Sequence, residues 1–248
     1  MNKTKRYSAI DWKNYFTNTS LIDEKIPVYW QGDSGPNLVC LHGAGHSGLS
    51  FAPLAGINKK YRTISFDFRG HGFNTMSEGE DLSQETLIRD TIRVLEFVNE
   101  KFPGECMVVV GHSMGGSIAT KTVAEVFKNK DTYPVLFDLI QGLIVIDVVE
   151  GTAMEALPFM ENFVKSRPKK FNSVEEGIEY FYKSGTIKNL ESARISVPPL
   201  LKEVEKDGNK IFEWKTNLLS SQKYWTGNIN YKFYFIIFNI FRMVHRTH

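Results

Sequence analysis

Short apolar runs alternate with stretches of helical periodicity along the first 150 residues. Runs over 28–31, 37–41, 62–68 and 107–110 are rich in β-branched or aromatic residues and predict strands. Between them, positions 87, 88, 92, 95 and 98 of the segment 83–99 are apolar, which is the spacing of one helix face. Another apolar run spans 139–149. Apolar strands without polar alternation, each followed by a helix, predict a mostly parallel sheet with helices on both faces.

The ends of the predicted elements carry their own signals. Ser83 or Asp81 is placed to cap the start of the helix at 83–99.

After about residue 151 the pattern changes to amphipathic helical stretches with more charge, which predicts an inserted cap over the sheet at about 151–225. The chain of 248 residues, 42% of them hydrophobic, is long enough for one extended core. We therefore expect a single domain over 1–227 that includes the cap.

Composition narrows the choice of partners and compartment. The formal net charge is +2, from 30 basic and 28 acidic side chains, and this balance does not indicate a nucleic acid or an anionic membrane as partner. Cys40 and Cys106 lie in or beside apolar runs, which is typical of small hydrophobes in a reducing compartment. The N-terminal residues lack the apolar stretch of a secretory signal. We expect a cytoplasmic protein, with the nucleus as a second location.

Residues 107–118 carry the main functional signal. An apolar strand leads into Gly-His-Ser-Met-Gly at 111–115, and a helical pattern follows. Glycine on both sides of Ser113 allows the close approach of strand and helix that a nucleophile elbow of an α/β-hydrolase needs. The helix start would direct the N–H of Met114 at an oxyanion. The alternative is a buried serine in a glycine-rich turn; the strand before it and the helix after it favour the nucleophile.

The loop after the strand at 37–41 offers the second oxyanion donor. It reads His-Gly-Ala-Gly, and the backbone N–H of Ala44 or Gly45 is in the expected place. His42 at its start is expected to be structural.

A second Gly-His-Ser sequence follows at 45–47. Here Leu49 stands where the second flanking glycine of an elbow belongs, and the segment is expected to continue as a loop instead of opening a helix. We interpret Ser47 as non-catalytic.

The acid of a catalytic triad follows the nucleophile in this fold and precedes the histidine. Asp147 stands at the end of the apolar run and fits that order, while Glu150 is close enough in sequence to compete for the role. Asp67 precedes the nucleophile and is expected to stabilise its own turn.

Beyond the elbow, the chain resembles the protein phosphatase methylesterases. The similarity includes Ile-Asp-Val-Val-Glu-Gly-Thr-Ala-Met-Glu-Ala-Leu at 146–157, which ordinary hydrolases lack. The other matching segments lie at 7–16, 35–36, 42–47, 111–116, 167–169, 184–194 and 223–225. Members of this α/β-hydrolase family remove the carboxymethyl ester from the C-terminal leucine of the protein phosphatase 2A catalytic subunit.

The resemblance implies roles for particular residues. Ser113 would be the nucleophile, Asp147 the triad acid, and the N–H groups of Ala44 and Met114 the oxyanion hole. The methylated tail of the protein phosphatase 2A catalytic subunit would be the partner, recognised by the cap and the cleft beneath it. No cofactor or metal is implied, and the sequence contains no metal-ligand cluster.

The triad histidine is the point of departure from the family. The likeness ends near Gly227, and the histidines that follow Asp147 are His245 and His248, among the last four residues. A chain end is rarely held firmly enough for catalysis, so no triad histidine is identified and impaired activity is expected. Two alternatives stay open: a phosphatase-binding protein without catalysis, and a general hydrolase of small esters.

The segment 228–248 has an unusual composition. Residues 228–241 use only five amino-acid types, all encodable with A and U at the first two codon positions, and codons 227–228 can include a GU splice donor. Our hypothesis is that this tail is translated intron, which sequencing of the transcript across codon 227 tests. A divergent final strand is the alternative. A membrane anchor is disfavoured because the run is shorter than the ~20 apolar residues needed to span a bilayer.

Overall fold

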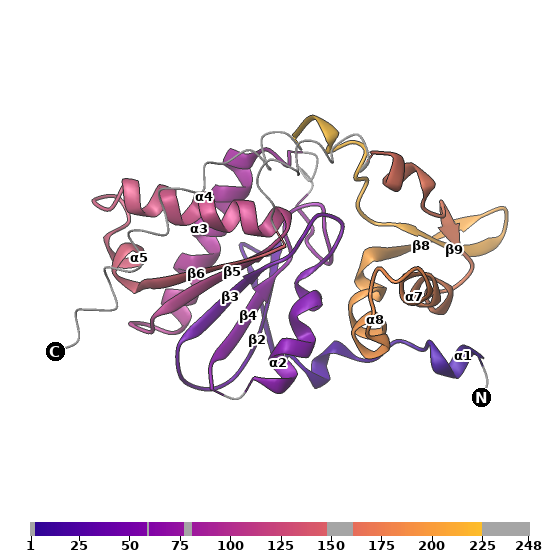
Figure 1. The fold of residues 1–248 in the computed structure, drawn as a ribbon, viewed down its shortest axis with the longest axis horizontal. Coiled ribbons are helices and arrows are strands. Elements are labelled where there is room, and N and C mark those ends of the chain that lie inside the picture. The colour runs from indigo at the N-terminus through magenta and orange to yellow at the C-terminus, as the bar shows by residue number, and fades with distance from the viewer. Residues whose placement is uncertain (1–2, 59, 77–80, 148–160, 225–248) are drawn as a thin grey trace.

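A six-stranded sheet forms the body of the molecule (Figure 1). The computed structural model describes residues 3–58, 60–76, 81–147 and 161–224. The main-sheet strands are β1 (Asn18–Ile22), β2 (Ile26–Gln31), β3 (Asn37–Leu41), β4 (Arg62–Phe66), β5 (Met107–His112) and β6 (Ile140–Ile146). The helices and 3₁₀ turns of this part are α1 (Lys3–Arg6), η1 (Trp12–Asn14), η2 (Gly48–Phe51), α2 (Ala52–Ile57), α3 (Gln84–Lys101), α4 (Met114–Lys128) and α5 (Pro134–Leu139).

The sheet is mixed, with a parallel majority. Its strand order is β1-β2-β4-β3-β5-β6, and the pairs from β4 through β6 are parallel. The β1–β2 and β2–β4 pairs are antiparallel, and β1 is a strand that the sequence pattern did not reveal. Its exposed and partly buried side chains alternate, so it lacks the continuous apolar run that marked the inner strands.

Two apolar clusters lie on the two faces of the sheet. One joins Val39 and Leu41 of β3 to buried side chains of α3 and α4. The other holds Cys40 of the same strand with side chains of η2 and α2. Successive residues of a strand point to opposite faces, so an unbroken apolar strand supplies both clusters at once. The predicted coverage of both faces is confirmed (Figure 1).

Several predicted boundaries shift in the structure. The strand predicted over 62–68 ends at Phe66, and the helix predicted over 83–99 runs as α3 over Gln84–Lys101. The side chain of Ser83 makes no capping hydrogen bond. Asp81 instead accepts hydrogen bonds from the Ser83 N–H at 3.1 Å and from the Thr86 hydroxyl at 2.7 Å, so it organises the start of α3.

The predicted cap contains strands as well as helices, which corrects the expectation of helices alone. Its elements are β7 (Lys170–Phe171), α7 (Val174–Lys183), α8 (Leu190–Ser196), η3 (Pro198–Leu200), β8 (Leu201–Lys206) and β9 (Asn209–Trp214). The strands form an antiparallel sheet in the order β7-β9-β8. Most side chains of β8 are exposed and charged, so the sequence offered no apolar run to reveal that strand.

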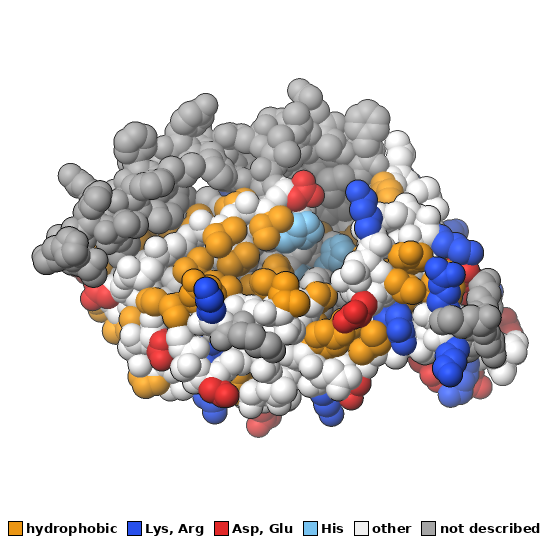
Figure 2. Space-filling view, turned by 60° about the horizontal axis from the view of Figure 1, so that its bottom comes forward, with side chains coloured by type: hydrophobic (Ala, Val, Ile, Leu, Met, Phe, Trp, Pro, Cys, Tyr) orange, Lys and Arg blue, Asp and Glu red, His pale blue; other side chains and the backbone are white. Residues whose placement is uncertain are grey.

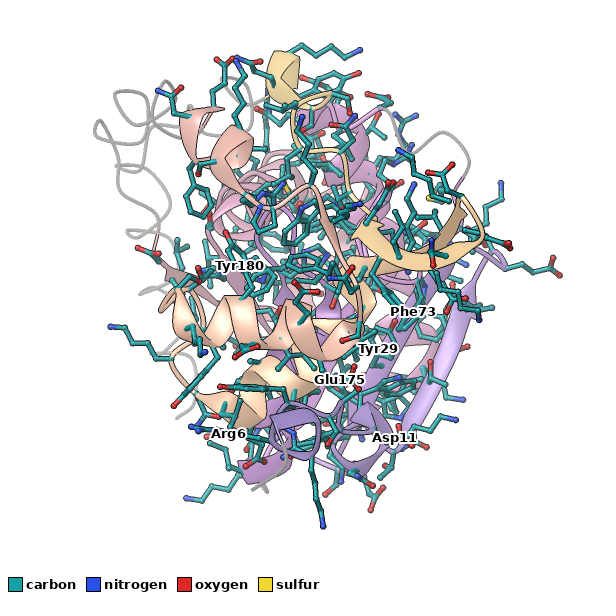
Figure 3. The ribbon with its side chains drawn as sticks, turned by 90° about the vertical axis from the view of Figure 1, so that its right-hand side faces the viewer. Arg6, Asp11, Tyr29, Phe73, Glu175 and Tyr180 are labelled. Carbon is teal, nitrogen blue, oxygen red and sulfur yellow. The ribbon has the colours of Figure 1, made fainter. Side chains whose placement is uncertain are left out.

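The N-terminal segment lies along the helices of the cap. Figure 3 shows the segment that carries Arg6 and Asp11 beside the helix that carries Glu175. The N–H of Ile10 donates to the carbonyl oxygen of Arg194 at 3.0 Å, and the Arg194 guanidinium donates to the carbonyl oxygen of Ser8 at 2.6 Å. The part of the cap before residue 161 and the tail at 228–248 fall outside the described residues, so the domain limits stay a prediction.

The described helices include none that is long and apolar enough to cross a lipid bilayer.

Candidate active site

Ser113 occupies a strained turn between β5 and α4. Its backbone has φ 52° and ψ −122°, a conformation that costs a residue with a side chain about 1–3 kcal/mol. The Ser113 N–H donates to the carbonyl oxygen of Ile146 at 2.9 Å, which ties the turn to the end of β6. The side chain does not cap α4, although Ser113 is the residue at its N-cap. A strained serine with no capping role is the arrangement that a nucleophile elbow requires.

The two glycines around Ser113 are imposed by packing. A Cβ on Gly111 would lie 2.3 Å from the carbonyl oxygen of Gly115, and a Cβ on Gly115 would lie 2.3 Å from the carbonyl oxygen of Leu41. Both contacts are with backbone, which cannot rotate away as a side chain can. The close approach of strand and helix that the sequence predicted at this turn is therefore present.

The loop after β3 has one free candidate for an oxyanion donor. The N–H of Gly45 donates to Nε2 of His71 at 3.0 Å, so this N–H is already used. Among the described residues, none accepts a hydrogen bond from the N–H of Ala44. Of the two donors that the sequence offered, Ala44 is thus the one that stays available, together with Met114 at the first turn of α4.

His42 and His71 are structural, as the sequence led us to expect for His42. The Phe68 N–H donates to Nε2 of His42 at 3.0 Å, and Nδ1 of His42 lies 2.8 Å from the carbonyl oxygen of Gly43. Burial lowers the pKa of His42 well below its ordinary value and lowers the pKa of His71 to about 4. Both rings are therefore neutral near pH 7, and both are committed to backbone contacts.

Asp147 directly follows β6, as predicted, and lies near the turn at Ser113. Its backbone has φ 53°, and its side chain is 79% exposed. One carboxylate oxygen lies 3.9 Å from Nε2 of His112, the residue before Ser113. Burial holds the pKa of His112 below its ordinary value, and the Asp147 charge opposes that shift. Glu150, the competing acid, lies outside the described residues.

Asp67 stabilises its own turn and also ties that turn to neighbouring segments. This fully buried carboxylate accepts hydrogen bonds at 2.7 Å from the Phe73 N–H, the Gly48 N–H and the Tyr29 hydroxyl. Burial raises the pKa of Asp67, and these hydrogen bonds oppose the rise. The structural role expected from the sequence is confirmed.

Ser47 differs from the sequence prediction in one respect. It opens a helical segment, because η2 begins at Gly48 and continues into α2. Its own backbone is extended, with φ −145°, and its hydroxyl is buried without a hydrogen-bond partner among the described residues. A buried hydroxyl on relaxed backbone has neither the access nor the strain of an elbow.

A group of four histidines around the turn was not recognised from the sequence. His42 and His71 lie 5.1 Å apart and His46 and His112 lie 6.2 Å apart, measured between ring centroids. Figure 2 shows histidine side chains reaching the surface between a hydrophobic area and a group of Lys and Arg side chains. The available signal was that His42 follows a strand and His112 ends one, because the ends of parallel strands meet at one edge of the sheet. The described residues contain no group of three or more His, Cys, Asp or Glu side chains that could hold a metal ion.

Most of the chain also matches the model of a known protein family. The model of the alpha/beta hydrolase family matches residues 38–231. The chain belongs to this family. The elbow at Ser113 therefore lies inside the matched part of an alpha/beta hydrolase.

Curated relatives of this hydrolase carry the name that the sequence resemblance pointed to. This chain is 40% identical over 209 residues to "Protein phosphatase methylesterase 1" of Homo sapiens, and the match covers 80% of this chain and 52% of the relative. It is 37% identical over 241 residues to the protein of that name in Schizosaccharomyces pombe, covering 88% of this chain and 65% of the relative. The chain thus spans about half the length of its mammalian relatives.

Solved structures confirm the fold. "E-2-(Acetamidomethylene)succinate Hydrolase" superposes with a TM-score of 0.63 at 21% identity, covering 83% of this chain and 69% of that one. "Thioesterase Domain From Curacin Biosynthetic Pathway" superposes with a TM-score of 0.57 at 21% identity, covering 86% of this chain and 74% of that one. At this level of identity the likeness concerns the fold of the alpha/beta hydrolase alone.

Proposed function

We propose that this hydrolase acts on the methyl ester at the C-terminal leucine of the protein phosphatase 2A catalytic subunit, with Ser113 as nucleophile. The observation that carries the proposal is the strained elbow at Ser113, with Asp147 following the neighbouring strand. The name shared by the curated relatives supports the choice of a phosphatase ester over other esters. We place the reaction in the cytoplasm and, as a second location, the nucleus.

The proposed chemistry is acyl transfer to serine and then to water. The Ser113 oxygen attacks the ester carbonyl carbon as its proton passes to a base, and the N–H groups of Ala44 and Met114 stabilise the oxyanion. In comparable sites, losing one such donor costs about 3 kcal/mol. The C–O bond to the methoxy group breaks, methanol leaves with a proton, and water then releases the leucine carboxylate. Asp147 is the acid that orients the base.

The base is the weak part of this site. In the chain order of this fold it follows Asp147, and the histidines there are His245 and His248, which lie outside the described residues. His42 and His71 are held by backbone contacts. Triad members act as a unit, so we propose that this chain turns over several orders of magnitude more slowly than a relative whose triad histidine is held in place.

Demethylation of the methylated phosphatase tests the proposal. The purified chain is incubated with the protein phosphatase 2A catalytic subunit, and the remaining methyl ester is followed with time, beside Ser113→Ala. Slow demethylation that disappears in Ser113→Ala is expected. Equal rates for both proteins would contradict catalysis by Ser113, and turnover as fast as that of a full-length relative would contradict the impairment.

A phosphatase-binding protein without catalysis is the second candidate. It is favoured by the same observation that weakens catalysis, namely the commitment of His42 and His71 to backbone. In that case the chain and its Ser113→Ala variant bind the phosphatase equally and neither removes the ester.

A general hydrolase of small esters would instead cleave a chromogenic ester and leave the phosphatase methylated.

A further inference from the structure

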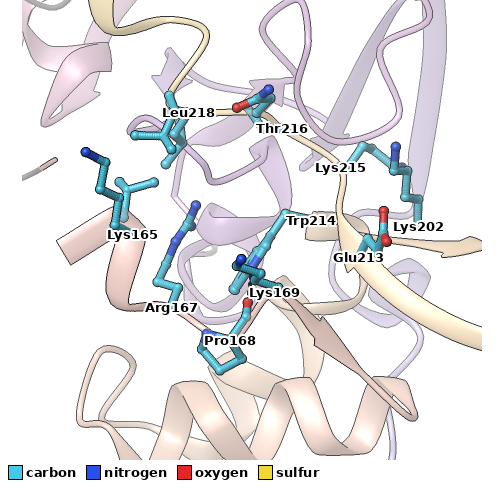
Figure 4. A pocket seen from close by; sticks show the side chains of 13 residues that line it. Lys165, Arg167, Pro168, Lys169, Lys202, Glu213, Trp214, Lys215, Thr216 and Leu218 are labelled. Carbon is cyan, nitrogen blue, oxygen red and sulfur yellow. Dashed lines mark hydrogen bonds between the residues drawn. The ribbon is translucent and has the colours of Figure 1, made fainter. Parts of the chain in front are cut away.

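A pocket of about 600 Å³ lies between the start of the described cap and the end of β9 with the segment that follows it (Figure 4). One wall comes from residues 164–165 and 167–169 and the other from residues 213–219, with Lys202 of β8 beside them. Figure 4 shows Lys202 and Lys215 together with Glu213 at one end, and Arg167 between Trp214 and Leu218. We call it the basic pocket.

The charge of the basic pocket is strongly unbalanced. Its lining includes five Lys or Arg side chains and a single carboxylate, that of Glu213. Lys165 is paired with Glu161 outside the lining, at 2.5 Å. Lys169 and Lys202 are exposed, and in the described part of the chain neither is paired with a carboxylate. The whole chain has a net charge of only +2, so the excess is a local feature of this pocket.

Arg167 is the residue that points to an anionic ligand. Its guanidinium lies 4.2 Å from the centroid of the Trp214 ring, and the Trp214 indole N–H is held by the carbonyl oxygen of Pro168 at 2.7 Å. The Nε atom of Arg167 is buried and has no hydrogen-bond partner among the described residues. Burying a cationic donor without a partner is costly, and a carboxylate offers the fork-shaped guanidinium its best partner.

The basic pocket adjoins the loop that carries the oxyanion donor. Leu218 packs so closely against Gly45 that a Cβ there would lie 2.9 Å from one of its methyl groups. The hydroxyl of Thr216 donates to the carbonyl oxygen of Gly70 at 2.8 Å. The positive charge of Arg167 is also near enough to contribute to the lowered pKa of His46, after burial and the neighbouring histidines. A chain bound in the pocket can therefore continue toward Ser113.

We propose that the basic pocket binds the carboxylate side chains of an acidic peptide segment that precedes the esterified C-terminus, an inference that rests on the proposed function for the position of the ester. Arg167 and the lysines at the rim supply the charges, and Trp214 supplies the apolar wall. The pocket thereby selects the sequence around the ester, while Ser113 performs the reaction.

Peptide binding to the whole chain tests this inference without any need for turnover. Two fluorescent peptides with a C-terminal leucine methyl ester are compared by anisotropy at low salt on the Ser113→Ala protein, one with two Asp residues before the ester end and one with Asn in their place. The Asp peptide is expected to bind about tenfold more tightly, with a preference that shrinks as salt is added.

Two double variants localise the effect. Lys169→Glu with Lys202→Glu is expected to remove the preference for Asp, because both lysines line the pocket and neither forms an ion pair with another described residue. Lys128→Glu with Lys130→Glu makes the same charge change at the far end of α4, about 22 Å from its N-terminus, and is expected to keep the preference.

Several outcomes would overturn the inference. These are equal affinity for the two peptides, a preference that survives Lys169→Glu with Lys202→Glu, or a single-stranded oligonucleotide that displaces the Asp peptide at lower concentration than unlabelled Asp peptide does. The proposed function can fail separately. An Asp preference without any Ser113-dependent demethylation would contradict the proposed enzyme activity and support the peptide site. Ser113-dependent demethylation without an Asp preference would support the enzyme activity and contradict the peptide site.

Discussion

The turn at Ser113 and the turn at Ser47 share the tripeptide Gly-His-Ser, yet the two serines differ in backbone conformation and burial. Ser113 has φ 52° and does not use its hydroxyl to cap the helix that follows. Ser47 has φ −145° and a fully buried hydroxyl. The difference comes from the residues two positions away: glycines at 111 and 115 permit a backbone approach that Leu49, a buried core residue, does not reproduce. A serine thus becomes a candidate nucleophile through its neighbours' lack of side chains.

Removing the two hydroxyls should give the largest contrast. We expect Ser113→Ala to lower demethylation by about 100-fold, to the level of buffer alone, and Ser47→Ala to leave it unchanged. The expected loss is smaller than for a complete triad, because under the proposed function Ser113 has no firmly held base and contributes less. Long incubations with methylated phosphatase measure both rates. An equal loss in Ser47→Ala would remove the distinction between the turns.

Adding a methyl group to the elbow should be the next largest effect. Gly115→Ala places a Cβ against the carbonyl oxygen of Leu41, and we expect a loss of about 3 kcal/mol in unfolding free energy, or some 6–12 °C in Tm. Gly142→Ala in β6 is the matched control, because its nearest neighbour would be a methyl group of Val108 at 3.4 Å. Thermal unfolding checks both variants, and equal melting points would contradict the packing argument.

Acid should weaken the turn at Ser47 through its neighbour Gly45. The N–H of Gly45 depends on a neutral His71, whose pKa is lowered to about 4 in the folded protein by burial. Between pH 6.5 and 4, His71 is therefore protonated in the unfolded chain but not in the folded chain, so the free energy of unfolding falls as the pH falls. From pH 6.5 to 5 this amounts to about 2 kcal/mol for this histidine.

Denaturant unfolding at pH 7, 6 and 5 measures the slope. His71→Gln keeps an acceptor for the Gly45 N–H but does not titrate, so its stability should fall less over the same range. Identical slopes for both proteins would show that His71 is not the group responsible.

The smallest effect concerns the Ser47 hydroxyl itself. It is buried without a hydrogen-bond partner among the described residues, so its removal relieves a desolvation cost. We expect Ser47→Ala to raise the unfolding free energy by up to about 1 kcal/mol. Equilibrium unfolding in urea resolves a shift of this size, and a destabilised variant would indicate a partner for the hydroxyl.

The inner strands and the elbow could be predicted because their signals are local. An unbroken apolar run marks a strand buried on both faces, as in β3 and β5. By contrast β1 alternates and β8 is mostly charged, so both were missed. These strands are stabilised by pairing with a partner strand, and pairing leaves little trace in the strand's own sequence.

The candidate site divides in the same way. Ser113 and Asp147 could be found because each directly follows an apolar strand. That the N–H of Ala44 is free and the N–H of Gly45 is not could not be predicted, because the Gly45 N–H is bound by His71 from another loop. The basic pocket was equally hidden, since its walls come from segments about 50 positions apart and short basic runs are usually solvated.

By itself, the sequence determined the fold family and the glycine-flanked turn at Ser113, because glycine spacing and apolar periodicity act over a few residues. The tertiary structure alone decided which backbone N–H groups are free, which histidines stay neutral and where cations outnumber carboxylates. Those properties depend on burial and on distances between segments remote in the chain, and they are set only when the layers pack together.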